Sequence, residues 1–145
     1  MPEHMADVAR AIQLALAPVF LLTGIAGMLN VMASRLARII DRGRVLSEER
    51  GGVVASEQDQ FELQNLERRR HLASVAITAC TIAALLLCVV IAILFLEVML
   101  DAPLGSLIGA LFTATTLALV VGLAFFLREV HLAMQSVRIS TFKPK

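Results

Sequence analysis

The chain has 145 residues, of which 58% are hydrophobic and 17% charged, and its formal net charge is +1 at pH 7. Soluble domains average about 45–50% apolar residues, so a mean hydropathy of +0.80 excludes an ordinary soluble domain. A nearly neutral chain also gives no general reason to expect nucleic-acid binding.

Three runs of the sequence contain no Asp, Glu, Lys, Arg or His: residues 11–34, 72–96 and 102–127. Each run is long enough to cross a hydrocarbon core of about 30 Å as a helix. The remaining residues are too few for a separate soluble domain of typical size. We therefore predict an all-α integral membrane protein with three transmembrane helices.

Residues 1–10 are predicted as an outer N-terminal segment. They carry Glu3 and Asp7 in place of a basic region, so we expect no cleavable signal peptide and assign residues 11–34 to transmembrane helix 1. Pro18 is a natural bend, because proline lacks an N–H and crowds the preceding turn. A break there would leave an interfacial helix ending at residue 17 and move the first span to about 18–40.

Residues 35–73 are predicted to form a cytosolic antiparallel helical hairpin between the first and second spans. Helical spacing continues beyond Arg35, and Gly51-Gly52 is a strong breaker that ends the first arm near Glu49. Ser56-Glu-Gln-Asp59 resembles a capping box and begins the second arm. An arm of about 15 residues would reach about 22 Å.

The remaining predicted segments are transmembrane helix 2 at 74–96, a short outer loop at 97–103, transmembrane helix 3 at 104–127 and a cytosolic tail at 128–145. The third helix is expected to continue to about Val137. Cys80 and Cys88 lie about 12 Å apart along the second helix, too far for a mutual disulfide. We interpret them as small packing residues.

The basic residues fix the expected orientation. One Lys or Arg precedes the first run, eight lie between the first and second, none lies in the outer loop and four follow the third run. Under the positive-inside rule, this alternation places the N-terminus outside and the C-terminus in the cytosol.

A polar stripe is expected on the first helix, from the middle of the membrane into the cytosol. Its members fall within about 80° of one another at 100° per residue; they are Thr23, Gly27, Asn30, Ser34, Arg38 and Asp41. Polar residues in a span face protein or water in preference to lipid. The stripe could line a water-filled path at an oligomer axis, or pack against the other spans of the chain.

Gly105-x-x-x-Gly109-x-x-x-Thr113 predicts a ridge of small residues on the third span. Such a ridge lets a second helix backbone approach closely. The partner helix could belong to the same chain or to another copy. Because three helices expose much surface to lipid, we expect a homo-oligomer.

Glu97 and Asp101 are the only charged residues in the outer loop. In a symmetric assembly they would form an acidic ring that concentrates cations at a pore mouth. The alternative interpretation is ordinary solvation of a short turn.

The first-loop arginines are dense enough to contact anionic lipid at the cytosolic leaflet. They could equally serve as topology determinants, partly paired with acids. Glu129, just after the third run, is expected to pair with Arg35 or Arg70. The candidate lipid or hairpin contacts are Arg35, Arg42, Arg69, Arg70 and Glu129.

No catalytic set is recognisable in the sequence. It holds no Ser/His/Asp arrangement, no H-E-x-x-H and no phosphate-binding or dinucleotide fingerprint. We therefore expect no enzymatic activity, no cofactor and no metal. The expected partners are membrane lipids, other copies of the chain and a cytosolic protein.

Four parts of the sequence carry a resemblance: Ile12-Gln-Leu-Ala-Leu-Ala-Pro-Val19, Asn30, Arg35-x-x-Arg38-Ile-x-Asp41-Arg42 and Arg69-Arg70. Over residues 8–137 the chain resembles a bacterial family of small three-span membrane proteins, catalogued as a domain of unknown function. The resemblance implies a bacterial inner-membrane location and a three-span layout. It implies no activity, substrate or catalytic residue.

Two classes of function remain open. The first is a homo-oligomeric structural or regulatory protein that acts through its cytosolic hairpin. The second is a homo-oligomeric ion channel or permeation protein with the polar stripe along its path. Because the spans hold no ionisable residue, we favour the first.

Overall fold

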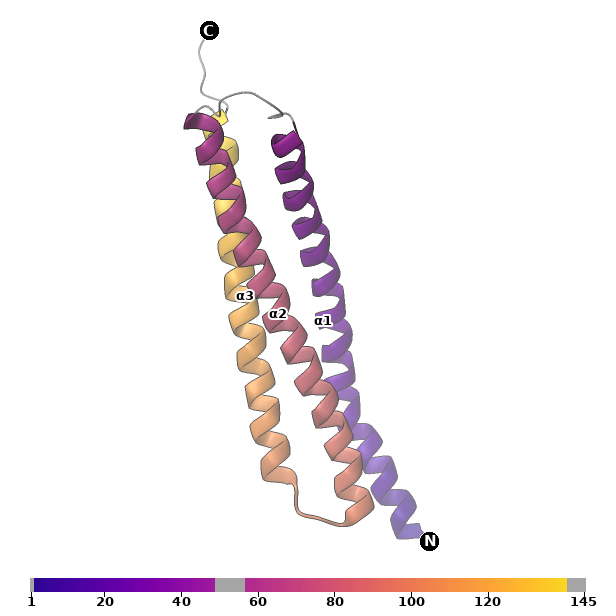
Figure 1. Cartoon of the computed structure of the whole chain (residues 1–145). Helices are drawn as coiled ribbons and strands as arrows, with labels where there is room; N and C mark the ends of the chain where they lie inside the picture. The colour runs from indigo at the N-terminus through magenta and orange to yellow at the C-terminus, as the bar shows by residue number, and fades with distance from the viewer. Residues whose placement is uncertain (1, 49–56, 141–145) are drawn as a thin grey trace.

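The computed structural model describes residues 2–48 and 57–140, and within them three helices: α1 (Pro2–Glu48), α2 (Glu57–Leu100) and α3 (Gly105–Ser140). The helices form an elongated antiparallel bundle with α2 between α1 and α3 (Figure 1). The segments Val8–Val45, Leu63–Leu100 and Gly105–Met134 are each long and apolar enough to cross a membrane. The all-α class and the three candidate spans are thus confirmed.

The predicted break at Pro18 does not occur. Pro18 is buried inside α1, which runs as one helix from Pro2 to Glu48. A proline removes a single helical N–H, and neighbouring helices and local adjustments of the backbone let membrane helices tolerate this loss. The interfacial helix ending at residue 17 and the span at 18–40 depended on that break, and the bounds of the first span within the membrane stay a prediction.

The buried positions of all three helices recur about every seven residues. In α1 they include Ile25, Met32 and Ile39, and in α3 they are Thr115, Gly122 and Glu129. The buried positions of α2 are spaced alternately by four and three residues over Ala76, Cys80, Ala83, Leu87 and Val90. This spacing keeps one face of each long helix against its neighbour and is typical of left-handed coiled-coil packing.

The central core combines larger apolar side chains of α1 with smaller ones of α2. Ile25 and Met32 are 1% exposed, and they pack in one cluster with Ala76, Cys80 and Leu87. On the other side of α2, a Cβ atom at Gly122 would lie 2.7 Å from Cys80 Sγ and 3.2 Å from the Ala76 carbonyl oxygen. Glycine at this position allows α2 and α3 to approach closely.

All three helices extend beyond their charge-free runs at the arginine-rich end of the bundle, where α1 ends and α2 begins. There α1 ends at Glu48, α2 begins at Glu57 and α3 continues to Ser140, close to the expected boundaries. Ile39 and Gly43 of α1 line a common cavity with Leu63 and Leu66 of α2. The extensions thus form two facing arms, residues 35–48 of α1 and 57–70 of α2. The expected Gly51-Gly52 breaker and Ser56 cap lie outside the described residues.

The opposite end of the bundle, the loop end, contains the turn between α2 and α3. Asp101 has φ = 50°, the one positive φ of a non-glycine residue in the described ranges. The Leu104 N–H donates to the Ala102 carbonyl at 2.9 Å, and the Ile108 N–H donates to the Leu104 carbonyl at 3.1 Å. Asp tolerates the left-handed conformation better than most residues, so it suits this reversal.

Candidate functional site

The six residues of the polar stripe lie on the outside of the bundle. All are exposed, and apart from Arg38, which also lines a groove between α1 and α2, they occupy the face of α1 opposite the one that packs on α2. Ser34, for example, follows the buried Ile25 by nine residues, which is two and a half turns at about 100° per residue and places the two on opposite sides of the helix. The stripe therefore does not pack against the other two helices of its own chain.

The polar side chains of the stripe differ in whether they form hydrogen bonds within α1. Thr23 Oγ1 donates to the Val19 carbonyl at 3.2 Å, and Ser34 Oγ donates to the Val31 carbonyl at 2.9 Å. Asn30 is exposed, and its carboxamide forms no hydrogen bond within the described part of the chain. An amide left unpaired in hydrocarbon costs several kcal/mol, on the order of 4–8 in the least polar reference solvent.

The same face of α1 changes character toward the loop end of the bundle. There its exposed residues are apolar: Leu16 is 50% exposed and Phe20 is 73% exposed. Gly24 and Gly27 separate this apolar part from Asn30, and a Cβ atom at either glycine would meet nothing within 4 Å. The outward face of α1 is thus half polar and half apolar along its length.

Glu129 forms an ionic junction, defined here as Glu129 with Arg35 and Arg69, at the arginine-rich end of the spans. The Glu129 side chain is 1% exposed, Arg69 Nη2 lies 3.0 Å from its Oε1 and Arg35 Nη1 lies 3.4 Å from its Oε2. Arg69 Nε donates a further hydrogen bond to Oε1 at 3.3 Å. One carboxylate from α3 therefore holds arginines from both other helices.

The ionic junction confirms Arg35 of the two expected alternatives and adds a partner from α2 that was not predicted. The partner from α2 is Arg69, and Arg70 instead lines an open cavity with Glu67, His71 and Ser74. Arg69 precedes the buried Ala76 by seven residues, so it lies on the packed face of α2. Arg70 is turned away by about 100°.

Phe126 gives the ionic junction an aromatic contact. Arg35 Cζ lies 5.6 Å from the centre of the Phe126 ring, within the range of a cation–π interaction. The side chains of Arg35 and Arg69 are only 36% and 21% exposed. Removing one partner from such a buried ion pair is costly, because the remaining charge stays buried without compensation.

Four of the arginines line one groove between α1 and α2. Its volume is about 300 Å³, and its wall consists of Arg35, Arg38, Ile39, Arg42, Leu66 and Arg69. The groove combines three residues expected to contact lipid with Arg38 of the polar stripe. Within residues 2–48 and 57–140, the side chains described as lining it include no acidic one.

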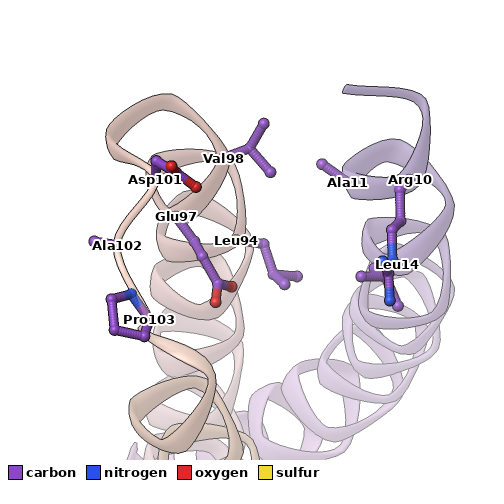
Figure 2. Close-up of a pocket in the computed structure, with 9 residues that line it drawn as sticks. All are labelled: Arg10, Ala11, Leu14, Leu94, Glu97, Val98, Asp101, Ala102 and Pro103. Atoms are coloured by element: carbon purple, nitrogen blue, oxygen red, sulfur yellow. The ribbon is translucent and has the colours of Figure 1, made fainter. Parts of the chain in front are cut away.

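Glu97 and Asp101 line a different cavity, at the loop end, of about 500 Å³ (Figure 2). Its opposite wall is α1, with Arg10, Ala11 and Leu14. The two acids therefore share a cavity with a basic residue of their own chain. Their arrangement in an acidic ring stays a prediction about an assembly.

The predicted small-residue ridge of α3 is exposed. A Cβ atom at Gly109 would meet nothing within 4 Å, and one at Gly105 would meet only Glu97 Oε1 at 3.9 Å. Thr113 Oγ1 donates to the Gly109 carbonyl at 2.9 Å, within its own helix. The glycine used within the chain is Gly122, which the small-residue pattern Ala118-x-x-x-Gly122 signals as well.

A metal site needs several ligating side chains close together. In residues 2–48 and 57–140, no group of three or more His, Cys, Asp or Glu side chains is close enough to hold a metal ion. The polar groups that stand out among the described residues are the clustered arginines, the buried carboxylate of Glu129 and the exposed carboxamide of Asn30.

Comparison with known proteins places the chain in a family. No curated protein and no solved structure matches it. Residues 15–139, which include the polar stripe, the ionic junction, most of the first apolar run and all of the other two, match the family described as protein of unknown function (DUF2721). The chain therefore belongs to this family, DUF2721.

Proposed function

We propose that this protein is a homo-oligomeric structural or regulatory component of the bacterial inner membrane. In this proposal, copies of the chain meet along the polar stripe of α1 and act through the two arms at the arginine-rich end. The observation that carries the proposal is the exposure of the stripe on the face of α1 opposite α2.

The energetic argument concerns Asn30. In a single chain its unpaired carboxamide would face lipid, and such a group in hydrocarbon costs several kcal/mol. Asn side chains that hydrogen-bond across two helices remove this cost and favour association in membranes. Gly27 lies beside Asn30 on the same face, and open space around it leaves room for a second helix backbone.

The orientation follows from the charges. Eight of the thirteen Lys and Arg residues lie between the first and second apolar runs, and none lies between the second and third. The positive-inside rule supports arms that extend into the cytosol. Fourteen residues of α1 beyond the membrane would reach about 20 Å, which presents a charged surface to a cytosolic protein.

An ion channel is the second candidate, and one observation bears directly on it. The polar residues of the outward face end near Thr23, and Leu16 and Phe20 continue the face toward the outside. A central path lined by this face would narrow to an apolar ring, and such constrictions gate by dewetting. We therefore favour the structural or regulatory role over an open pore.

Cysteine cross-linking in native membranes tests the oligomer. In a Cys88→Ala background, Ser34→Cys is expected to give disulfide-linked dimers on mild oxidation. Val120→Cys, which is 57% exposed on α3, serves as a control for random collisions. Equal cross-linking from both positions, or none from Ser34→Cys, would contradict the proposed α1 contact.

Conductance separates the two classes of function. The wild-type protein in planar bilayers is expected to pass no steady current. If Phe20→Ser opens a cation current that Glu97→Gln with Asp101→Asn reduces, the channel interpretation replaces the structural one.

A further inference from the structure

We propose that the groove between α1 and α2, lined by Arg35, Arg38, Arg42 and Arg69, is a binding site for a phosphate-bearing anionic group. The groove has a volume of about 300 Å³ and an apolar floor of Ile39 and Leu66. The proposal concerns a single chain and is independent of the proposed oligomer.

The first argument is charge. Four guanidinium groups line the groove, and none of its lining residues in the described part of the chain carries a carboxylate. Two of the four, Arg35 and Arg69, share the single carboxylate of Glu129 behind the groove. The ionic junction carries two positive charges and one negative charge, and Arg38 adds a third positive charge on the groove wall, so the site retains a net positive charge that an anion can balance.

The second argument is the position of the donors. A guanidinium has five N–H donors, and Glu129 accepts one from Arg35 and two from Arg69. These bonds and the Phe126 ring hold both arginines in place, while their other donors remain for a ligand. Arginine forks match phosphate oxygens in pairs, which makes Arg the preferred residue for phosphate recognition.

The third argument is depth. Arg35 directly follows the charge-free run of α1, and Arg69 precedes the run of α2 by three residues. The groove therefore lies at the boundary of the apolar spans, where the phosphates of a lipid leaflet lie. Basic pockets between helices at this level are a recognised form of lipid headgroup site. A free phosphate compound in the adjacent aqueous phase presents the same chemistry.

The test compares two double variants of the full-length protein. Arg38→Gln with Arg42→Gln removes two groove charges and leaves all three residues of the ionic junction intact. Arg68→Gln with Arg128→Gln removes two exposed charges near the same end that do not line the groove. Equal helix content and monodispersity of the two variants, from circular dichroism and gel filtration, establish that both are folded.

Two binding measurements separate the sources of the phosphate. Native mass spectrometry compares how much phosphatidylglycerol and how much phosphatidylcholine stay bound to the protein. Calorimetry in nanodiscs of neutral lipid measures the binding of inorganic phosphate. In the groove variant, the affinity for the ligand is expected to fall about tenfold or more, at about 1 kcal/mol per arginine. The control variant is expected to bind with the affinity of the wild type. Selective lipid retention identifies a headgroup site, and saturable phosphate binding identifies a soluble ligand. If neither ligand binds, or if both variants weaken binding equally, the proposal is wrong.

Discussion

The two ends of the bundle handle charge in opposite ways. At the arginine-rich end, Glu129 is buried and bonded to arginines from both other helices. At the loop end, Glu97, Asp101 and Arg10 line an open cavity of about 500 Å³ between α1 and the α2–α3 turn. Charges at one end hold the helices together, whereas charges at the other leave them apart. The stability of the bundle should therefore depend far more on the arginine-rich end.

Glu129→Ala is expected to have the largest effect, because it leaves Arg35 and Arg69 without their carboxylate. Breaking a buried ion pair from one side costs about 3–5 kcal/mol. Denaturation in mixed micelles, followed by circular dichroism, measures the change in the free energy of unfolding. The matched control is Glu97→Ala at the loop end, which should cost less than about 1 kcal/mol. Similar losses from the two variants would remove the contrast between the ends.

Gly122→Leu tests the close approach of α2 and α3 between the two ends. Its side chain would meet Cys80 Sγ and the Ala76 carbonyl, and overpacking of this kind costs about 1–3 kcal/mol or more. Gly109→Leu, on the open part of α3, should leave the unfolding free energy of the single chain within about 1 kcal/mol of the wild type. The same denaturation experiment distinguishes them, and a greater loss at Gly109 would contradict the described packing.

Arg69→Lys sharpens the arginine-rich side of the comparison. Lysine keeps the charge, but its single ammonium group cannot replace the two donors, Nε and Nη2, that Arg69 directs at Glu129. We therefore expect the free energy of unfolding to fall by about 1–2 kcal/mol. Arg70→Lys, one residue further along, should change the unfolding free energy by less than about 0.5 kcal/mol. An equal effect of the two substitutions would mean that the bidentate geometry contributes nothing.

Asp101→Gly should produce the smallest effect and the opposite sign. Asp101 adopts φ = 50°, which glycine reaches without steric cost, so the variant should be stabilised by up to about 1 kcal/mol. Ala102→Gly is the control and should be neutral or slightly destabilising. A loss of stability in Asp101→Gly would indicate that the carboxylate itself supports the turn.

Much of the architecture could be predicted from the sequence, because hydropathy and charge act locally. The three charge-free runs predict three helices, and the helical spacing beyond Arg35 predicts the extension of α1. The pairing of Glu129 with Arg35 was also accessible, since both residues border their apolar runs on the same expected side of the membrane. These inferences need the depth of a residue but not its direction around the helix axis.

The parts that sequence reasoning missed depend on how helices are rotated against one another. Whether Arg69 or Arg70 meets Glu129 is decided by the seven-residue register of α2 around Ala76. The helical spacing of 100° per residue placed Asn30 and Ser34 on one face of α1. The spacing alone could not show that α2 packs on the opposite face. The spacing of Gly105 and Gly109 likewise could not show which face of α3 packs on α2. The close contact is made at Gly122 instead.

The position of Glu129 near the end of the last helix has a consequence for biosynthesis. A ribosome makes α1 and α2 first, so Arg35 and Arg69 exist before the carboxylate that neutralises them. Charge balance at the membrane boundary is completed only when α3 has been inserted in its final orientation. Until α3 is in place, Arg35 and Arg69 lack the carboxylate to which both are bonded in the complete bundle.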